Sequence, residues 1–177
     1  MDFITKKGKQ IVIRQPKATD LEEITNFFNN LVQEDIYILR YGQKVTLPEE
    51  RKWLSSSLKS IKENKMVMLQ AWYKNKLAGQ IQITKGEFRK RFIGTIHIGI
   101  DKDFRGEGIG EELMKRAEKE AEKIEVKILE LTVFEENEPA LNLYKKMGLE
   151  KFGQLPKSIE FRGKMLDEVF MYKRLSP

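Results

Sequence analysis

Three glycines at alternate positions follow an arginine in the second half of the chain and precede a strongly helical run. The stretch FRGEGIGEEL contains Arg105, Gly106, Gly108 and Gly110. Because glycine costs about 1 kcal/mol relative to alanine inside a helix, these residues fit better in the turn before one. A glycine-rich turn that opens a helix favours phosphate binding, since first-turn N–H groups lack intrahelical partners and the helix dipole is positive there.

The spacing of these glycines disfavours two well-known nucleotide loops. The dinucleotide fingerprint requires a further glycine three positions after Gly108, where this chain has Glu111. The nucleotide P-loop requires Gly-Lys-Ser/Thr after four intervening residues, which is absent here. The pattern that remains is Arg-x-x-Gly-x-Gly, from Arg105 to Gly110.

A second group of candidate residues lies in the stretch LTVFEENEPALNLYKKMGL. Its spacing predicts a strand and then a short helix that begins near Pro139 and ends before a C-cap at Gly148. Asn137 is placed to cap the start of that helix. Tyr144 lies on the apolar stripe of the same helix, so spacing alone makes it a core residue.

The elements that must position these groups alternate along the chain. Hydrophobic periodicity predicts the order β-α-α-β-β-β-α-β-α-β-β, an α/β fold that starts largely antiparallel and contains a strand-helix-strand unit. Two Thr-x-x-Glu patterns, Thr19 with Glu22 and Thr46 with Glu49, predict the starts of the first two helices. We expect residues 1–177 to form a single domain, with 1–10 as a flexible N-terminal extension or an edge.

Composition narrows the classes of function. The 177 residues include no cysteine and one histidine, His97, which excludes disulfides, thiolate metal sites and a cysteine nucleophile. We therefore expect no metal. The absence of a long apolar run and of a secretory signal predicts a cytoplasmic protein without a membrane partner.

A net charge of +6 favours polyanionic partners in general. However, Lys and Arg alternate with Glu along most of the chain, as on a solvated surface. A nucleic-acid-binding module would explain the basic cluster Arg89, Lys90 and Arg91 but would leave the glycine loop without a role. We therefore expect no nucleic-acid partner.

The segment Arg105–Gly110 resembles the acetyl-CoA pyrophosphate loop of the GNAT superfamily of N-acetyltransferases, whose pattern is Gln/Arg-x-x-Gly-x-Gly/Ala. The second block resembles a later strand and helix of the superfamily, on the basis of Asn137, Leu143, Tyr144, Lys146 and Gly148. The resemblance covers about residues 11 to 175. It implies a GNAT-type mixed, mostly antiparallel sheet flanked by helices, with acetyl-CoA as the cofactor.

The resemblance implies transfer of an acetyl group to a primary amine of a small molecule or peptide by direct attack. The pyrophosphate would be held by the backbone amides of Arg105, Gly106, Glu107, Gly108, Ile109 and Gly110. Main-chain groups of Ile98, Gly99 and Ile100 would pair with the pantetheine arm, and Asn137 would contact the pantetheine or the phosphate side. Tyr144 would be the general acid for the departing thiolate. No covalent enzyme intermediate is required, in agreement with the absence of cysteine.

The general base and the acceptor stay open. Relatives that acetylate the N-terminus of ribosomal proteins carry a Glu five residues before the Asn, where this chain has Thr132. Glu130, His97 or a water chain is then the candidate base, and the protein N-terminal activity becomes the alternative. A non-catalytic acyl-CoA-binding module is another alternative. Glu34 and Asp35 are candidates to receive a cationic amine, and both a monomer and a homodimer are compatible with the sequence.

Overall fold

The computed structural model describes residues 2–40 and 42–175, and its elements follow the predicted order with one additional strand. The strands are β1 (Asp2–Ile4), β2 (Gln10–Arg14), β3 (Met66–Tyr73), β4 (Lys76–Lys85), β5 (Ile93–Ile100), β6 (Ile128–Phe134), β7 (Glu150–Phe161) and β8 (Lys164–Arg174). The α-helices are α1 (Leu21–Gln33), α2 (Leu47–Lys62), α3 (Ile109–Lys123) and α4 (Glu138–Lys146). The additional strand is β1, which lies within residues 1–10.

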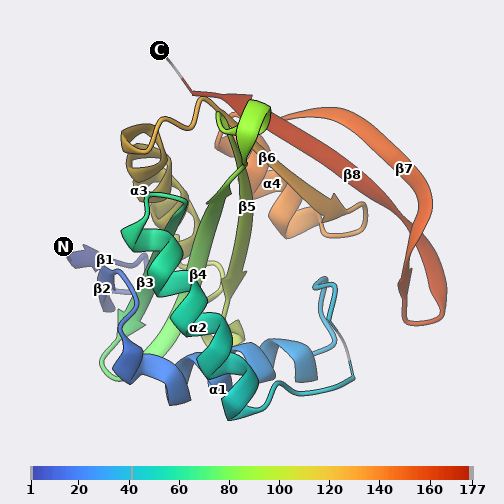
Figure 1. Ribbon diagram of the computed structural model, residues 1–177. Coiled ribbons are helices and arrows are strands. Elements are labelled where there is room, and N and C mark those ends of the chain that lie inside the picture. Colours follow the sequence, from blue (N-terminus) through green and yellow to red (C-terminus); the bar gives the residue numbers. More distant parts are fainter. Residues whose placement is uncertain (1, 41, 176–177) are drawn as a thin grey trace.

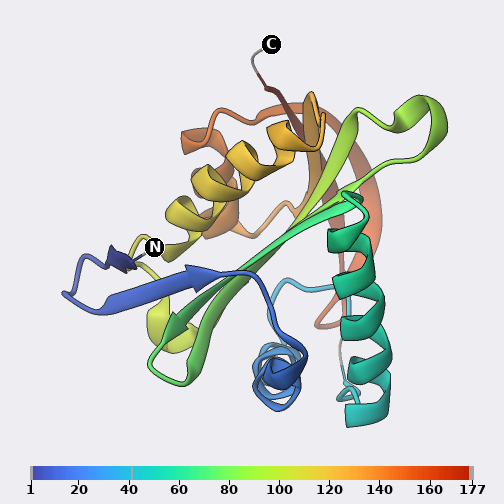
Figure 2. The same cartoon turned by 60° about the vertical axis from the view of Figure 1, so that its left-hand side comes forward.

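The strands form one eight-stranded sheet in the order β1-β2-β3-β4-β5-β6-β8-β7. Neighbouring strands are antiparallel except β5 and β6, which are parallel and joined through α3. Figures 1 and 2 show α1 and α2 on one face of the sheet and α3 and α4 on the other. The predicted mixed, mostly antiparallel sheet flanked by helices is confirmed.

The two predicted helix starts have different outcomes. The prediction at Thr46 is confirmed, because its hydroxyl accepts from the Glu49 N–H while the Glu49 carboxylate accepts from the Thr46 N–H at 2.8 Å. The prediction at Thr19 is wrong. There the chain first makes a 3-10 turn, and Asp20 accepts from the Lys17 N–H at 2.7 Å while its carboxylate also binds Arg14.

Helix α3 packs on the sheet through a buried face that has large apolar residues in its first half and two alanines in its second half. Ala117 and Ala121 are fully buried, as is Leu113 one turn earlier. These side chains belong to a core cluster that includes residues of β3 to β6. In the part of the chain that the structure describes, no helix has both the length and the apolar character needed to cross a membrane. Tight packing of α3 fixes where its first turn lies relative to the end of β5.

Candidate functional site

Strands β5 and β6 separate after three paired residues. In the described residues, their pairing runs from Ile93 with Ile128 to Thr95 with Glu130 and goes no further. On its other edge, β5 stays paired with β4 as far as Ile100. Within the described residues, the edge of β5 that faces β6 therefore pairs with no strand along the predicted pantetheine-binding residues Ile98, Gly99 and Ile100, although the Ile100 carbonyl oxygen accepts from the Arg105 side chain. A strand edge with free N–H and C=O groups can bind an extended ligand as an additional strand does.

The glycine loop joins this free edge to the first turn of α3. Gly106 has φ +73° and Gly108 has φ +90°, conformations that side chains rarely adopt. Gly108 is the N-cap of α3, and because it has no side chain it provides no side-chain cap for the first-turn N–H groups. Ile109 and Gly110 are the first residues of the helix. The arrangement suits an anion held by backbone N–H groups and the helix dipole.

Gly110 is required for a different reason, the close approach of α4. A Cβ atom at this position would lie 3.1 Å from Cδ2 of Leu143 and 3.9 Å from side-chain atoms of both Ile98 and Ile100. A second contact joins the helices, since Lys146 donates to Glu111 at 2.6 Å. The two sequence motifs are thus brought side by side next to the end of β5.

Glu111 lies on the first turn of α3 between two lysines. Hydrogen bonds from Lys115 and from Lys146 lower the pKa of its carboxyl from 4.5 to about 2. The carboxylate therefore stays charged at physiological pH. Its contact with Lys146 keeps the end of α4 close to the beginning of α3.

Asn137 and Tyr144 lie at opposite ends of α4. The Asn137 side-chain oxygen accepts from the Ala140 N–H at 3.3 Å, so Asn137 caps the helix, which was the alternative left open by the sequence. Tyr144 is only 7% exposed, and burial raises the pKa of its phenol from 10.0 to about 12. The phenol is therefore protonated throughout the physiological range and can act as a proton donor.

His97 and Glu130 lie on the opposite face of the sheet, which α1 and α2 cover. Gly99 shares the His97 face, and a Cβ there would come within 2.9 Å of Cδ1 of Leu31 in α1. Thr95 donates to Glu130 at 3.4 Å, which places that carboxylate at the point where the strands separate. The His97 residue is exposed, yet partial desolvation lowers the pKa of its imidazole below the ordinary 6.5.

The predicted amine-binding residues Glu34 and Asp35 are each paired with an arginine. Arg105 donates to Glu34 at 2.6 Å and to the carbonyl oxygen of Ile100 at 3.0 Å. Arg162, in the turn between β7 and β8, donates to both the carboxylate and the carbonyl oxygen of Asp35. These pairs attach the end of α1 to the glycine loop on one side and to the β7–β8 hairpin on the other.

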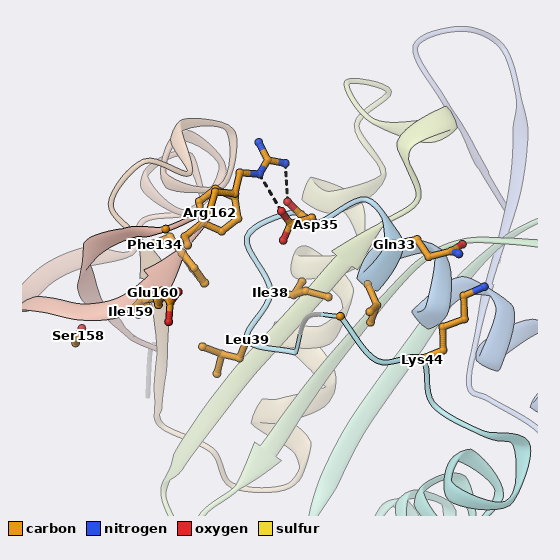
Figure 3. Close-up of a pocket in the computed structure, with 14 residues that line it drawn as sticks. Gln33, Asp35, Ile38, Leu39, Lys44, Phe134, Ser158, Ile159, Glu160 and Arg162 are labelled. Carbon is orange, nitrogen blue, oxygen red and sulfur yellow. Dashed lines mark hydrogen bonds and ion pairs between the residues drawn. The ribbon is translucent and has the colours of Figure 1, made fainter.

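A cavity of about 670 Å³ opens between the segment after α1 and the β7–β8 hairpin (Figure 3). Phe134, Ile38 and Phe161 give it an apolar wall, and the Asp35–Arg162 pair lies at its rim. The Tyr37 ring stacks on Phe161 with centroids 4.7 Å apart and meets Phe134 edge-on at 5.6 Å. Sequence reasoning missed these aromatic residues because their spacing resembles that of ordinary core positions, and only the tertiary fold brings them together.

The side chain of Glu107 is buried, whereas an acidic residue in a loop is ordinarily exposed to solvent. Its backbone belongs to the glycine loop, but its side chain is fully buried and binds Lys9 and Thr5 of the N-terminal segment. The only sign of this burial in the local sequence is that Glu107 stands between two glycines. The lysines that neutralise it lie about a hundred residues away in the sequence.

Comparisons with known proteins agree with this geometry. Residues 29–149 match the model described as the Acetyltransferase (GNAT) family. "Putative phosphinothricin acetyltransferase YwnH" of Bacillus subtilis (strain 168) is 24% identical over 170 residues, which are 94% of this chain and 100% of YwnH. An acetyltransferase of the GNAT family from Streptococcus pneumoniae has a TM-score of 0.84 at 26% identity, covering 94% of this chain and 99% of that one.

A further solved structure of similar fold contains the cofactor. It is a phosphinothricin acetyltransferase from Sinorhizobium meliloti in complex with acetyl-CoA, with a TM-score of 0.81 at 19% identity. The alignment covers 94% of this chain and 89% of that protein.

Proposed function

Because the chain belongs to the acetyltransferase (GNAT) family, we propose that it transfers an acetyl group from acetyl-CoA to a primary amine of a small molecule or peptide. Family membership rests on a match that covers 121 of the 177 residues, from 29 to 149. The observation that carries the proposal is the edge of β5 left unpaired by β6, which is followed, after a 3-10 turn at Lys102–Phe104, by a glycine loop at the start of α3.

The backbone groups of the glycine loop and of the β5 edge suit the two polar parts of acetyl-CoA, its pyrophosphate and its pantetheine amides. The backbone amides from Arg105 to Gly110 would hold the pyrophosphate, and the free edge from Ile98 to Ile100 would pair with the pantetheine arm. Gly110 lies close to Ile98, Ile100 and Leu143. It therefore adjoins both the proposed pyrophosphate site in the loop and the proposed pantetheine site along β5. When bound, acetyl-CoA supplies the thioester that a neutral amine attacks.

The candidate acid and bases lie on opposite faces of the sheet, with the gap between β5 and β6 between them. Tyr144 belongs to α4 on one face, while His97 and Glu130 face α1 and α2 on the other. This separation suits direct attack, because a base must take a proton from the amine while an acid gives one to the departing thiolate. Backbone N–H groups at the gap would stabilise the oxyanion.

The cavity beside the β7–β8 hairpin is the proposed acceptor site. Phe134 lines it, and Thr132 and Glu130 follow at alternate positions on the same face of β6, leading from the cavity to the gap. Thr132 is exposed on this face and has no carboxylate. A small-molecule or short peptide amine is therefore preferred over the protein N-terminal alternative, in which the base is a glutamate at this position.

Thiol release with a panel of primary amines tests the proposed function. We expect coenzyme A and acetyl-CoA to raise the melting temperature, and at least one amine to give acetyl-CoA-dependent thiol release together with an acetylated product. Binding of the cofactor without turnover across small amines, amino acids and peptides would favour the non-catalytic acyl-CoA-binding alternative. No stabilisation at concentrations far above a micromolar dissociation constant would contradict both readings.

The pH dependence of turnover identifies the base. A base acts in its deprotonated form, so kcat/KM rises as pH increases through its pKa. If His97 is the base, its lowered pKa predicts a rise with a midpoint below 6.5 that is lost in His97→Gln. If Glu130→Gln removes the rise and His97→Gln does not, Glu130 is the base. The pKa of Tyr144, about 12, predicts that loss of the acid form causes no decline up to about pH 10.

A further inference from the structure

Strands β1 and β2 form a hairpin, residues 2–14, that contacts the glycine loop. We call the segment Phe3–Lys9 the N-terminal clasp, because it holds Glu107 from two sides. The Thr5 hydroxyl donates to one oxygen of the Glu107 carboxylate at 2.8 Å, and the Lys9 ammonium donates to the other at 2.7 Å. Lys7 approaches the same carboxylate at 3.6 Å.

The clasp also touches the backbone of the loop. The Lys6 N–H donates to the carbonyl oxygen of Glu107 at 3.3 Å. A Cβ at Gly108 would lie 3.6 Å from the Phe3 ring and 3.9 Å from the Lys6 side chain, so the clasp covers this glycine. The Glu107 side chain is 0% exposed. The glycines on either side of it, Gly106 and Gly108, both have positive φ.

We propose that Glu107 is a positioning residue for the cofactor, which holds the phosphate loop in its binding conformation by anchoring it to the N-terminal clasp. This inference rests on the proposed function. Two glycines give the loop freedom that it would have to lose on binding, and ordering each residue costs free energy. Because the clasp fixes the residue between these glycines in advance, the loop N–H groups stay directed towards the anion.

The charge of Glu107 is consistent with this role. The Lys9 hydrogen bond is the main cause that lowers the pKa of the Glu107 carboxyl below its ordinary value, and Thr5 contributes as well. The carboxylate is therefore ionised at physiological pH. Its negative charge is taken up by the clasp lysines and directed away from the anion site, which removes the repulsion that an acidic loop residue would otherwise cause.

Equilibrium binding of coenzyme A and steady-state kinetics with acetyl-CoA test the proposal. For Glu107→Ala we expect the dissociation constant of coenzyme A and the KM for acetyl-CoA to rise about tenfold, since preorganisation is lost. The kcat at saturating acetyl-CoA should stay within about twofold, because no reacting group changes. Glu107→Gln, which can still accept from Thr5, should show a smaller rise.

Two further variants separate positioning from a merely structural role. Glu118→Ala is the matched control, because Glu118 lies on α3 away from the loop and pairs with Lys173 at 2.8 Å. It should lower the melting temperature without changing coenzyme A affinity. Thr5→Val removes the hydroxyl that donates to Glu107 and that also accepts from the N–H groups of Lys7 and Lys9 within the clasp. Combined with Glu107→Ala, it should weaken binding no further than Glu107→Ala alone, since the clasp acts on the loop through Glu107. If Glu107→Ala does not fold, Thr5→Val alone carries the test and should still raise the dissociation constant.

The outcomes distinguish this proposal from the proposed function. Unchanged coenzyme A affinity in Glu107→Ala and Thr5→Val, with normal binding by the wild type, would overturn the role of the clasp and leave the acetyltransferase function standing. A loss of kcat at unchanged affinity would overturn it as well. Wild-type protein that bound no coenzyme A would overturn the proposed function, and the clasp's role with it.

Discussion

Tyr144→Phe is expected to lower kcat about 100-fold or more at saturating acetyl-CoA, since general acid catalysis typically contributes roughly 10²–10⁴-fold. The substitution removes the phenolic hydroxyl and keeps the ring, which is buried in the core cluster. Coenzyme A affinity and the melting temperature should therefore change little. Product formation under single-turnover conditions measures the chemical step directly.

The high pKa of Tyr144 is compatible with this role. An alkyl thiol ordinarily has a pKa of about 8.5. Proton transfer to an exposed thiolate from a phenol whose pKa is about 12 would therefore be unfavourable. A thiolate leaving group beside Tyr144 would be desolvated by the same surroundings, which raises its pKa as well. The two values then approach each other, and the proton can move from the phenol to sulfur.

Tyr73→Phe is the matched control for the acid assignment. Tyr73 ends β3, away from the gap, and its ring packs against Phe104 with centroids 5.8 Å apart. This variant should keep the wild-type kcat. Equal turnover of Tyr144→Phe and wild type would show that the proton comes from another donor, such as solvent entering through the gap.

The fold was predictable where local sequence patterns decide it. The strand Met66–Tyr73 is a run of apolar and aromatic residues interrupted only by Gln70, and the cap at Thr46 depends on two residues of one turn. The cap predicted at Thr19 was wrong because a 3-10 turn, Ala18–Asp20, precedes the helix, so that Asp20 is the N-cap in its place. Strand β1 was not predicted as a strand, since three residues form one only by pairing with β2.

Partners of the site residues were less predictable, because they come from distant parts of the chain. The acidic pair Glu34 and Asp35 carries no local sign that Arg105 and Arg162 neutralise it. Glu107 likewise depends on Lys9. The glycine pattern predicted where the backbone N–H groups are accessible to a ligand, because a positive φ and the close approach of another helix both require glycine at that position. Which side chains surround that backbone is decided by tertiary packing.

Gly110→Val is expected to raise the KM for acetyl-CoA about 100-fold, through the loss of space where α3, α4 and β5 meet. A Cβ alone would lie 3.1 Å from Leu143, and valine adds two methyl groups. Overpacking of this kind typically costs about 1–3 kcal/mol, so the melting temperature should fall too. The larger effect on cofactor binding is expected because the added methyl groups would project towards Ile98 and Ile100, beside the free edge of β5.

A second substitution separates the two causes. Leu143→Ala makes room on the α4 side, so in Gly110→Val/Leu143→Ala the melting temperature should recover part of its loss if packing against Leu143 is the cause. The KM for acetyl-CoA should stay high in the double variant, because the valine still lies beside the β5 edge. Gly110→Ala should give intermediate values of both quantities. If the double variant recovered cofactor affinity fully, the clash with Leu143 would explain the whole effect, and the path along Ile98 and Ile100 would not be the one the cofactor uses.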